Sequence, residues 1–301
     1  MKKALVTGAN GFIGKALVGE LINQKVEVIA LDREDLGIFP DTRFAVCDLR
    51  NCEAMPSLIS DRDIDTVFHL AWGGASGDLR ADYAMQLENV KMTCDMVNTA
   101  AKMNIKKFVG AGTLAQYDCL AYVGEDNSVP SPVSCYGTAK IAAQYMSKAA
   151  ANKAGIEHVW CIISNLYGVG DTTNNFINFA AKKLLNGERA SFTAAEQNYD
   201  FVYITDIIQG IYLCGENGKN NNSYYIGSGN ARPLKEFIEI MRNAIDSGIP
   251  LYLGEVEFKG RSLPPEAFDC RHITNDTGYV PKVRFEDGIV DTIKWLKGEI
   301  K

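Results

Sequence analysis

The sequence predicts an α/β protein built on a doubly wound parallel sheet, with a small lobe towards the carboxyl end. Short apolar runs alternate with helical patterns over the first 164 residues, and a glycine-rich turn follows the first run. After residue 164 the elements become shorter and less regular. Strands that are separated by helices need crossover connections, so we expect a parallel sheet covered by helices on both faces.

The elements of this sheet domain follow from their residue patterns. The strands are apolar, β-branched runs, expected at residues 3–7, 26–31, 43–47, 66–70, 106–111 and 157–163. The helices carry apolar residues at helical spacing, expected at residues 12–21, 81–103 and 134–152. We expect residues 1–164 to form one domain, to which residues 199–216 return as a strand at 199–204 and a helix at 205–214. The rest of residues 165–301 is expected to form a discontinuous lobe.

Composition excludes several classes of partner. The net charge is −6, which argues against nucleic acid and anionic membrane surfaces. No apolar stretch is long enough to span a membrane, and the residues before the first glycine are too few for a signal peptide. The eight cysteines are scattered without a C-x-x-C pair, and no histidine lies at metal-ligand spacing. We therefore expect a cytoplasmic protein without a metal site.

A glycine-rich turn lies between the first strand and the first helix. The helix start there offers unpaired N–H groups and the positive end of the helix dipole, and glycines let a pyrophosphate approach the backbone. A turn without any ligand is the alternative, but Asp32 ends the second strand 18 residues after Gly14, where a carboxylate can bind an adenine ribose. Asp32 favours NAD, whereas Arg33 could attract the phosphate of NADP, which stays open. The residues expected to hold the dinucleotide at this turn are Gly8, Asn10, Gly11, Phe12, Ile13 and Gly14.

A tyrosine and a lysine share one face of the helix expected at residues 134–152. Tyr136 and Lys140 are four positions apart, so the ammonium group can stabilise the phenolate and suit it to general acid and base catalysis. This pair alone is common on amphipathic helices. Thr113, however, follows the strand expected at residues 106–111, at the sheet edge where ligands of such folds bind, and could hydrogen-bond the same substrate oxygen. A strand-terminal turn is the alternative role of Thr113.

Taken together, these motifs resemble the extended short-chain dehydrogenase/reductase family, and within it the NAD-dependent epimerase/dehydratase members that act on nucleotide sugars. The resemblance covers nearly the whole chain, from the opening at residues 6–14 to the ending at residues 278–295. It implies a Rossmann-type NAD(P)-binding domain at residues 1–164 and a substrate-binding lobe within residues 165–301.

The resemblance also implies roles for individual residues. In the cofactor site, Asp48 and Leu49 would meet the adenine, Leu70 and Ala71 would lie beside the cofactor, and Asn89 would support the active site. Thr113, Tyr136 and Lys140 would be catalytic, and the tyrosine and lysine would also contact the cofactor. The residues expected to contact the substrate are Trp72, Thr113, Asn165 and Arg261, although plain packing explains Trp72 equally well.

Three departures from the family pattern concern the substrate. Gly112 stands where a serine is usual, and Ile162 and Tyr199 replace arginines. The resemblance therefore defines the chemistry more closely than the substrate.

The expected activity is that of an NAD(P)-dependent nucleotide-sugar epimerase or 4-keto reductase, with Tyr136 as the acid and base. Leu114 and Ala115 stand where dehydratases of the family carry Asp-Glu, which argues against that branch. A catalytically silent NAD(P)-binding regulatory protein is the alternative. Relatives form a homodimer through the two long helices, and we expect the same here.

Overall fold

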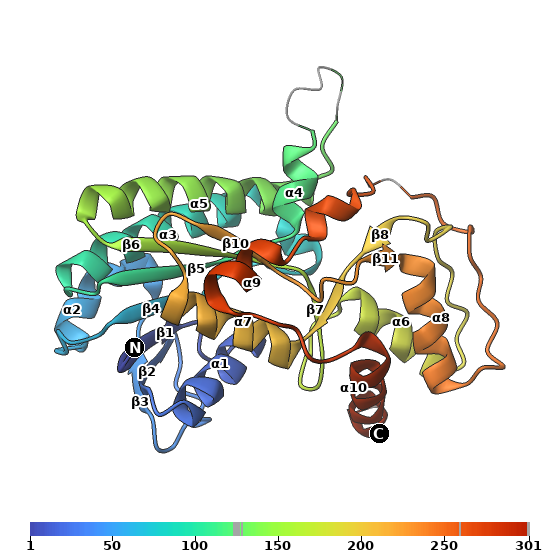
Figure 1. Cartoon of the computed structure of the whole chain (residues 1–301), viewed down its shortest axis with the longest axis horizontal. Helices are drawn as coiled ribbons and strands as arrows, with labels where there is room; N and C mark the ends of the chain where they lie inside the picture. The colour runs from blue at the N-terminus through green and yellow to red at the C-terminus, as the bar shows by residue number, and fades with distance from the viewer. Residues whose placement is uncertain (123–126, 128, 259, 300–301) are drawn as a thin grey trace. The chain divides into compact units, whose positions relative to one another are not determined.

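The protein contains a seven-stranded parallel sheet. The computed structural model describes residues 1–122, 127, 129–258 and 260–299. The strand order is β10-β6-β5-β4-β1-β2-β3, and every neighbouring pair is parallel. The predicted doubly wound fold is thereby confirmed (Figure 1). The strands are β1 (Lys3–Thr7), β2 (Glu27–Asp32), β3 (Arg43–Val46), β4 (Thr66–His69), β5 (Lys107–Thr113), β6 (Glu157–Ile163) and β10 (Ser223–Ile226).

The direction of winding changes between β1 and β4. The chain proceeds from β1 to β2 and β3 on one side, and from β4 to β5, β6 and β10 on the other. In open α/β sheets such a switch point opens a crevice at the carboxyl ends of the strands. All five residues of β1 are buried, because this strand lies in the middle of the sheet with helices on both faces.

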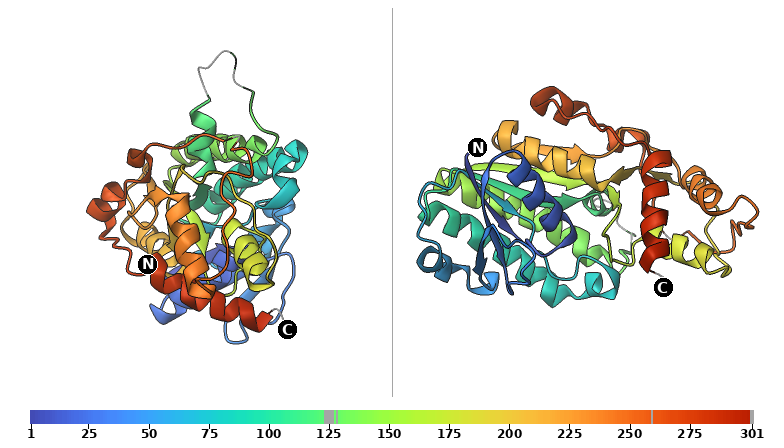
Figure 2. Two further views of the ribbon diagram at one scale, coloured as in Figure 1. Left: turned by 90° about the vertical axis from the view of Figure 1, so that its right-hand side faces the viewer. Right: turned by 90° about the horizontal axis from the view of Figure 1, so that it is seen from below.

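Helices cover both faces of the sheet. Figures 1 and 2 show α3 (Tyr83–Lys102) and α5 (Ser134–Ala154) on one face and α1 (Phe12–Asn23) and α7 (Ile204–Asn217) on the other. The helix expected at residues 81–103 begins later, at Tyr83, because the side chain of Asp82 accepts a hydrogen bond from the backbone of Met85 and caps it. A short 3-10 helix, η2 (Gly77–Ala81), precedes it.

β5 is longer than expected and carries the site. It continues through Gly112 and Thr113, which pair with Ile162 and Ile163 of β6. Thr113 therefore ends the strand itself, at the carboxyl edge of the sheet, and does not lie in the following turn.

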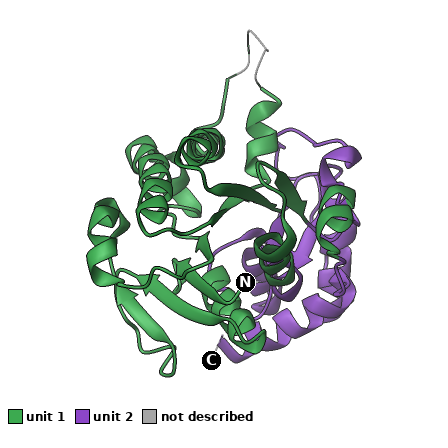
Figure 3. Ribbon diagram, turned by 60° about the vertical axis from the view of Figure 1, so that its left-hand side comes forward, with its two compact units in different colours: residues 1–163, 208–226, 271–279 green, residues 164–207, 227–270, 280–301 purple. Residues whose placement is uncertain are grey.

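The chain divides into two compact units (Figure 3). Unit 1 comprises residues 1–163, 208–226 and 271–279, and unit 2 comprises residues 164–207, 227–270 and 280–301. The expected strand at residues 199–204 differs in the structure, because it is split into β8 (Asn198–Tyr199) and β9 (Phe201–Tyr203). β9 pairs with β7 (Asn165–Tyr167) and β8 with β11 (Arg232–Pro233), so residues 199–207 belong to unit 2 and residues 208–216 to unit 1.

Unit 2 has an aromatic core of its own. The rings of Phe201, Phe237 and Phe285 pack together, with centroids 4.8 to 5.6 Å apart. Around them lie α6 (Phe176–Leu185), α8 (Leu234–Ile245) and α10 (Phe285–Glu299). The remaining helical segments of the chain are η1 (Leu49–Ala54), α2 (Met55–Leu58), α4 (Ala115–Leu120), η3 (Pro265–Phe268) and α9 (Arg271–Thr277).

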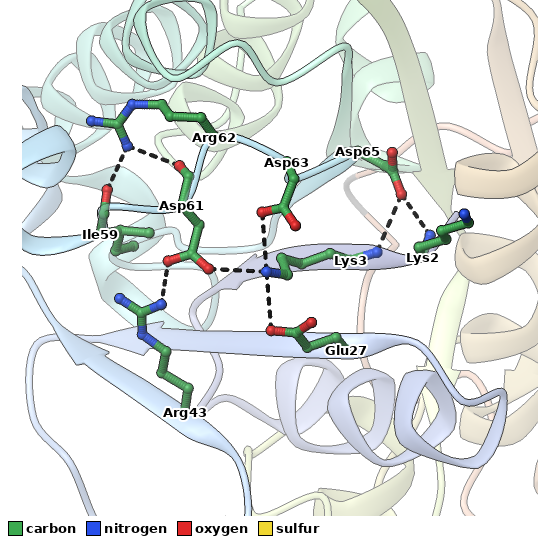
Figure 4. Close-up of polar contacts among 9 residues, drawn as sticks. All are labelled: Lys2, Lys3, Glu27, Arg43, Ile59, Asp61, Arg62, Asp63 and Asp65. Carbon is green, nitrogen blue, oxygen red and sulfur yellow. Dashed lines mark hydrogen bonds and ion pairs between the residues drawn. The ribbon is translucent and has the colours of Figure 1, made fainter.

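An ionic network closes the amino ends of the first strands, at the edge opposite the crevice (Figure 4). The ammonium group of Lys3, the first residue of β1, lies 3.0 Å from carboxylate oxygens of Asp61 and Asp63 and 3.1 Å from Glu27. Arg43, the first residue of β3, pairs with Asp61 as well. These carboxylates raise the pKa of Lys3 and hold its charge in the folded chain.

Across residues 1–122, 127, 129–258 and 260–299, the structure has no helix that is both long and apolar enough to cross a membrane.

Candidate active site

The glycine turn is tightly packed against its neighbours. Gly8 has a φ of +74°, and a side chain there would put a Cβ atom 2.7 Å from the backbone nitrogen of Ala71. A Cβ atom on Gly14 would lie 2.1 Å from the carbonyl oxygen of Gly8. Both contacts explain why only glycine fits. Phe12 and Ile13 open α1, and the N-cap residue is Gly11. Because glycine has no side chain to cap the helix, the N–H groups at the helix start stay available to a ligand.

The carboxylate of Asp32 holds the glycine turn and stands beside Arg33. Its oxygens accept hydrogen bonds from the backbone N–H of Asn10 at 3.0 Å and of Arg33 at 2.8 Å. The Asn10 side chain donates to the carbonyl of Glu34 at 2.7 Å. Its own Oδ1 atom is buried and has no hydrogen-bond partner among the residues that the structure describes. This oxygen is an acceptor that a ligand could satisfy.

Asp48 caps the turn after β3. Its carboxylate accepts from the backbone and the guanidinium of Arg50, and this contact with Arg50 lowers the pKa of Asp48. Leu49 beside it is buried. A charged and an apolar group are thus presented together at the expected adenine position.

A cavity of about 720 Å³ runs past these groups, along the carboxyl ends of the strands in unit 1. A volume of this size is typical of sites for small molecules and cofactors. The residues that were predicted at the cofactor site and line this cavity are Gly8, Asn10, Gly11, Asp32, Arg33, Asp48, Leu49, Leu70 and Ala71. Trp72, predicted to contact the substrate, lines it too.

The end of β4 is held by a buried, neutral histidine. His69 Nδ1 lies 3.0 Å from the hydroxyl of Thr7, and Nε2 lies 3.3 Å from the hydroxyl of Thr93. Because Thr93 donates its own proton to the carbonyl of Asn89, Nε2 carries the hydrogen of the ring. Burial, with the nearby charge of Lys140, lowers the pKa of His69 to about 3, so it stays uncharged at neutral pH.

Tyr136 and Thr113 meet at the first turn of α5. The tyrosine is buried, and its side chain makes a hydrogen bond with Thr113 at the end of β5. Burial raises the pKa of Tyr136, while the hydrogen bond and the charge of Arg80 oppose this rise. The structure therefore brings the expected hydroxyl pair into contact.

Lys140 is buried one turn further along α5. Its ammonium group donates to the carbonyl of Ala111 at 2.7 Å and lies 5.9 Å from the centroid of the Tyr136 ring. Burial lowers the pKa of Lys140 to about 7. The ammonium also lies 3.6 Å from the centroid of the Trp72 ring, a cation–π contact.

Two side chains of α3 clamp the loop that carries Trp72. Asn89 makes two hydrogen bonds with the backbone of Gly73, one as acceptor at 2.9 Å and one as donor at 2.8 Å. Gln86 accepts from the indole nitrogen of Trp72 at 2.9 Å and donates to the carbonyls of Gly74 and Leu79. Asn89 thus supports the loop backbone, and Trp72 and Gly73 of the loop line the cavity.

A buried amide network behind Thr113 escaped the sequence analysis. The side-chain oxygen of Gln116 accepts from the backbone of Thr113 and from the indole of Trp160, both at 3.1 Å, and its nitrogen donates to Gln144 at 2.6 Å. A Cβ atom on Gly112 would lie 2.3 Å from the same indole nitrogen. Gly112 replaces the usual serine because Trp160 occupies the space.

Arg80 was also missed. It belongs to η2, and its guanidinium carbon lies 4.7 Å from the centroid of the Tyr136 ring. No pattern in the sequence marks it, because the path of the loop between residues 73 and 82 decides where it points.

Asn165 and Arg261 lie in unit 2. Asn165 begins β7, and its side chain and backbone both donate to the carbonyl of Asp200. Arg261 is exposed in the segment between α8 and η3. The other predicted site residues all belong to unit 1, whereas Asn165 and Arg261 belong to unit 2.

The fold and the site define an enzyme that works with a dinucleotide cofactor. The glycine turn, the cavity at the switch point of the sheet and the buried tyrosine and lysine beside it form one continuous region of unit 1. Residues 4–227 match the family described as the NAD dependent epimerase/dehydratase family, and the chain belongs to this family.

Relatives of the chain act on nucleotide sugars. A putative UDP-glucose 4-epimerase of Methanocaldococcus jannaschii is 27% identical over 315 residues, covering 97% of this chain and 98% of the relative. A dTDP-6-deoxy-L-talose 4-dehydrogenase (NAD(P)(+)) of Kitasatospora kifunensis is 26% identical over 303 residues, covering 95% and 93%. A UDP-glucose 4-epimerase from Thermotoga maritima, solved with UDP-glucose, has the same fold, with a TM-score of 0.84 at 22% identity over 99% of this chain and 100% of that chain.

Proposed function

We propose that this protein is an NAD-dependent nucleotide-sugar epimerase or 4-keto reductase in which Tyr136 exchanges a proton with the sugar. The observation that carries the proposal is the buried phenol of Tyr136, which lies edge-on to Trp72 of the cavity wall and whose pKa is raised by burial but lowered by a side-chain hydrogen bond with Thr113. Lys140 lies on the same helix face, and Trp72 connects both residues to the cavity.

The residues around the cavity suit a dinucleotide. Gly8, Gly11 and Gly14 let the turn pack closely at the start of α1, where the backbone N–H groups would bind a pyrophosphate. The buried Oδ1 of Asn10, unpartnered within the described residues, would accept a hydrogen bond from the ligand. Asp32 would accept hydrogen bonds from the adenine ribose, and Asp48 with Leu49 would hold the adenine. When bound, NAD takes up or returns the hydride of the reaction.

The proton step follows from the contacts of Tyr136. Thr113 donates to the substrate oxygen or to the phenolate, and so orients both. A phenolate of Tyr136 accepts the proton of a sugar hydroxyl as the hydroxyl is oxidised, and a phenol returns a proton when a ketone is reduced. The cation of Lys140 stabilises the phenolate and would also hold the ribose next to the nicotinamide. His69 takes no part, because it stays neutral and bonds only to structural hydroxyls.

We infer that the substrate is a nucleotide sugar. The relatives from Methanocaldococcus and Kitasatospora are named for such substrates. In unit 2, the amide of Asn165 and the guanidinium of Arg261 are suited to a sugar nucleotide and its diphosphate, since arginine binds phosphate oxygens with two parallel hydrogen bonds.

Turnover of individual UDP- and dTDP-sugars, with NAD or NADH, tests the proposal. Conversion of one sugar into its isomer without net change in NADH identifies an epimerase, and stoichiometric oxidation of NADH with a 4-keto sugar identifies a reductase. Tight binding of NAD without turnover of any of these sugars would overturn the proposal in favour of a silent, regulatory NAD-binding protein.

We also propose a homodimer through α3 and α5. The two helices pack against each other and expose large apolar side chains to solvent, namely Tyr83, Leu87, Tyr145 and Met146. Sedimentation at several concentrations should show a dimer, and Leu87→Glu with Met146→Glu should produce a monomer. A wild-type monomer at all concentrations would contradict this assignment.

We propose a cytoplasmic location, because the eight cysteines are free thiols, which a reducing compartment favours.

A further inference from the structure

A second cation lies closer to the Tyr136 ring than Lys140 does. The guanidinium carbon of Arg80 is 4.7 Å from the ring centroid, whereas the ammonium nitrogen of Lys140 is 5.9 Å away. Trp72 contacts the same ring edge-on, with the two ring planes at 83°. The phenol ring therefore contacts both a guanidinium and an indole.

We propose that Arg80 is a positioning residue for the proton step, whose guanidinium stabilises the anionic form of the Tyr136 side chain. The inference rests on the proposed role of Tyr136 as the acid and base. It adds a group that acts through the tyrosine and comes from η2, in the loop after β4.

The loop holds Arg80 in place. Gln86 donates to the carbonyl of Leu79, the residue next to Arg80, and Asp82 caps the helix that follows at once. The Nε atom of Arg80 is buried and makes no hydrogen bond within the described part of the chain. The loop backbone thus fixes where Arg80 leaves the chain, and its guanidinium lies against the ring, a geometry in which the charge acts on the phenol.

The charge of Arg80 is also the more permanent of the two. Burial lowers the pKa of Lys140 to about 7, so a large fraction of this lysine is neutral at physiological pH. The Lys140 ammonium is directed to the carbonyl of Ala111 and the face of Trp72. A guanidinium, in contrast, remains protonated at every pH at which the protein is folded. Arg80 can therefore stabilise the phenolate when Lys140 has lost its proton.

Other ionisable groups surround this pair. On α4, burial raises the pKa of Asp118, and the charge of Arg80 opposes that rise, so an ionised Asp118 partly offsets Arg80. Cys119, also on α4, is buried with a raised pKa and stays a neutral thiol. On β4, His69 is neutral. Arg80 and Lys140 are thus the two cations that lie near the Tyr136 ring among the described residues, and an ionised Asp118 would be the counter-charge of Arg80.

A titration of the phenol tests the inference without any turnover. The ultraviolet phenolate band is followed from about pH 8 to about pH 12.5, and the same curve of the matching Tyr136→Phe protein is subtracted, which leaves Tyr136 alone. In Arg80→Met the midpoint should rise by about one pH unit, which is about tenfold less phenolate at a given pH. Arg80→Lys, which keeps the charge, should titrate between the two.

Arg284→Met is the matched control. Arg284 is exposed immediately before α10, and its side chain pairs with Asp287. This variant should leave the midpoint unchanged. An Arg80→Met midpoint equal to that of the wild type, with circular dichroism showing a folded protein, would overturn the inference. Failure of the proposed function has a different signature, namely full turnover in Tyr136→Phe, so the two can be told apart.

Discussion

The ammonium group of Lys140 lies over the indole ring of Trp72, with 3.6 Å between the nitrogen and the ring centroid. From the sequence, the role of Trp72 could be either packing or contact with the substrate. The structure gives it a third role, because the ring faces a buried cation that also donates a hydrogen bond to the carbonyl of Ala111. A cation–π contact away from water stabilises the charged form by about 1 to 2 kcal/mol.

Replacing the indole should therefore make Lys140 less basic. Trp72→Leu keeps the site apolar and removes the ring face, so the pKa of Lys140 should fall further below its value of about 7. The basic limb of the kcat/KM profile should move by about one unit to lower pH, since it reports the loss of the lysine proton. Trp72→Phe retains a ring and should move the limb less. An unchanged limb in Trp72→Leu would mean that the indole does not act on the lysine.

Asp32 should decide between NAD and NADP. Its carboxylate accepts from the backbone of Asn10 and Arg33, while the Arg33 side chain is exposed. Asp32→Asn keeps an acceptor in place and removes the charge that repels a 2′-phosphate, so affinity for NADP should rise by about tenfold. Calorimetric titration with both cofactors measures this change. Adding Arg33→Ala should reverse the gain, and a wild-type protein that prefers NADP would show that Arg33 prevails.

Restoring the usual serine at position 112 should destabilise the protein. A Cβ atom there would lie 2.3 Å from the Trp160 indole and 2.5 Å from the Gln116 oxygen. Gly112→Ser should lower the free energy of unfolding by about 1 to 3 kcal/mol, as overpacked cores do. Urea denaturation measures it, and the combination with Trp160→Leu should recover part of the loss. If Gly112→Ser lowered the free energy of unfolding equally in the wild type and in Trp160→Leu, Trp160 would not be the cause of the loss.

The network at Lys3 should stabilise the fold at neutral pH and lose its effect in acid. The contacts with Lys3 and Arg43 hold the pKa of Asp61 below its usual range, so this carboxylate contributes stability above the unfolded pKa of about 4 and loses it as the pH falls. Lys3→Met leaves the clustered carboxylates without their shared cation and should lower the melting temperature at pH 7. The difference from the wild type should shrink below about pH 4, where the carboxylates take up protons.

Lys2→Met is the neighbouring control for this experiment. Lys2 is exposed and contributes its backbone to the network, through Asp65. Its melting temperature should follow that of the wild type. If the melting temperature of Lys3→Met were lower than that of the wild type by the same amount at all pH values, the loss would come from packing and not from the charges.

Local patterns in the sequence predicted the sheet and the glycine turn because each depends on neighbours along the chain. The buried run of β1 and the close contact of Gly14 with Gly8 both follow from residues a few positions apart. Arg80 could not be predicted in this way. Its place against Tyr136 depends on a loop path that is set by Gln86, and such a path leaves no periodic signal.

The same reason explains the other differences. Gly112 stands out as a departure in the sequence, yet its cause is Trp160, a residue of the neighbouring strand. β9 has the apolar pattern of a sheet strand, but it pairs with β7 in unit 2, since pairing is chosen by tertiary contacts and not by strand propensity.

The most direct test of the central claim is turnover and cofactor affinity in Tyr136→Phe. The variant keeps the ring, its contacts with Trp72 and Arg80 and the cavity, and removes only the hydroxyl that Thr113 contacts. Loss of general acid and base catalysis should reduce kcat by about 10² to 10⁴-fold, with the Kd for NAD changed by less than about twofold. A Tyr136→Phe protein that turns over its sugar nucleotide as fast as the wild type would contradict the account.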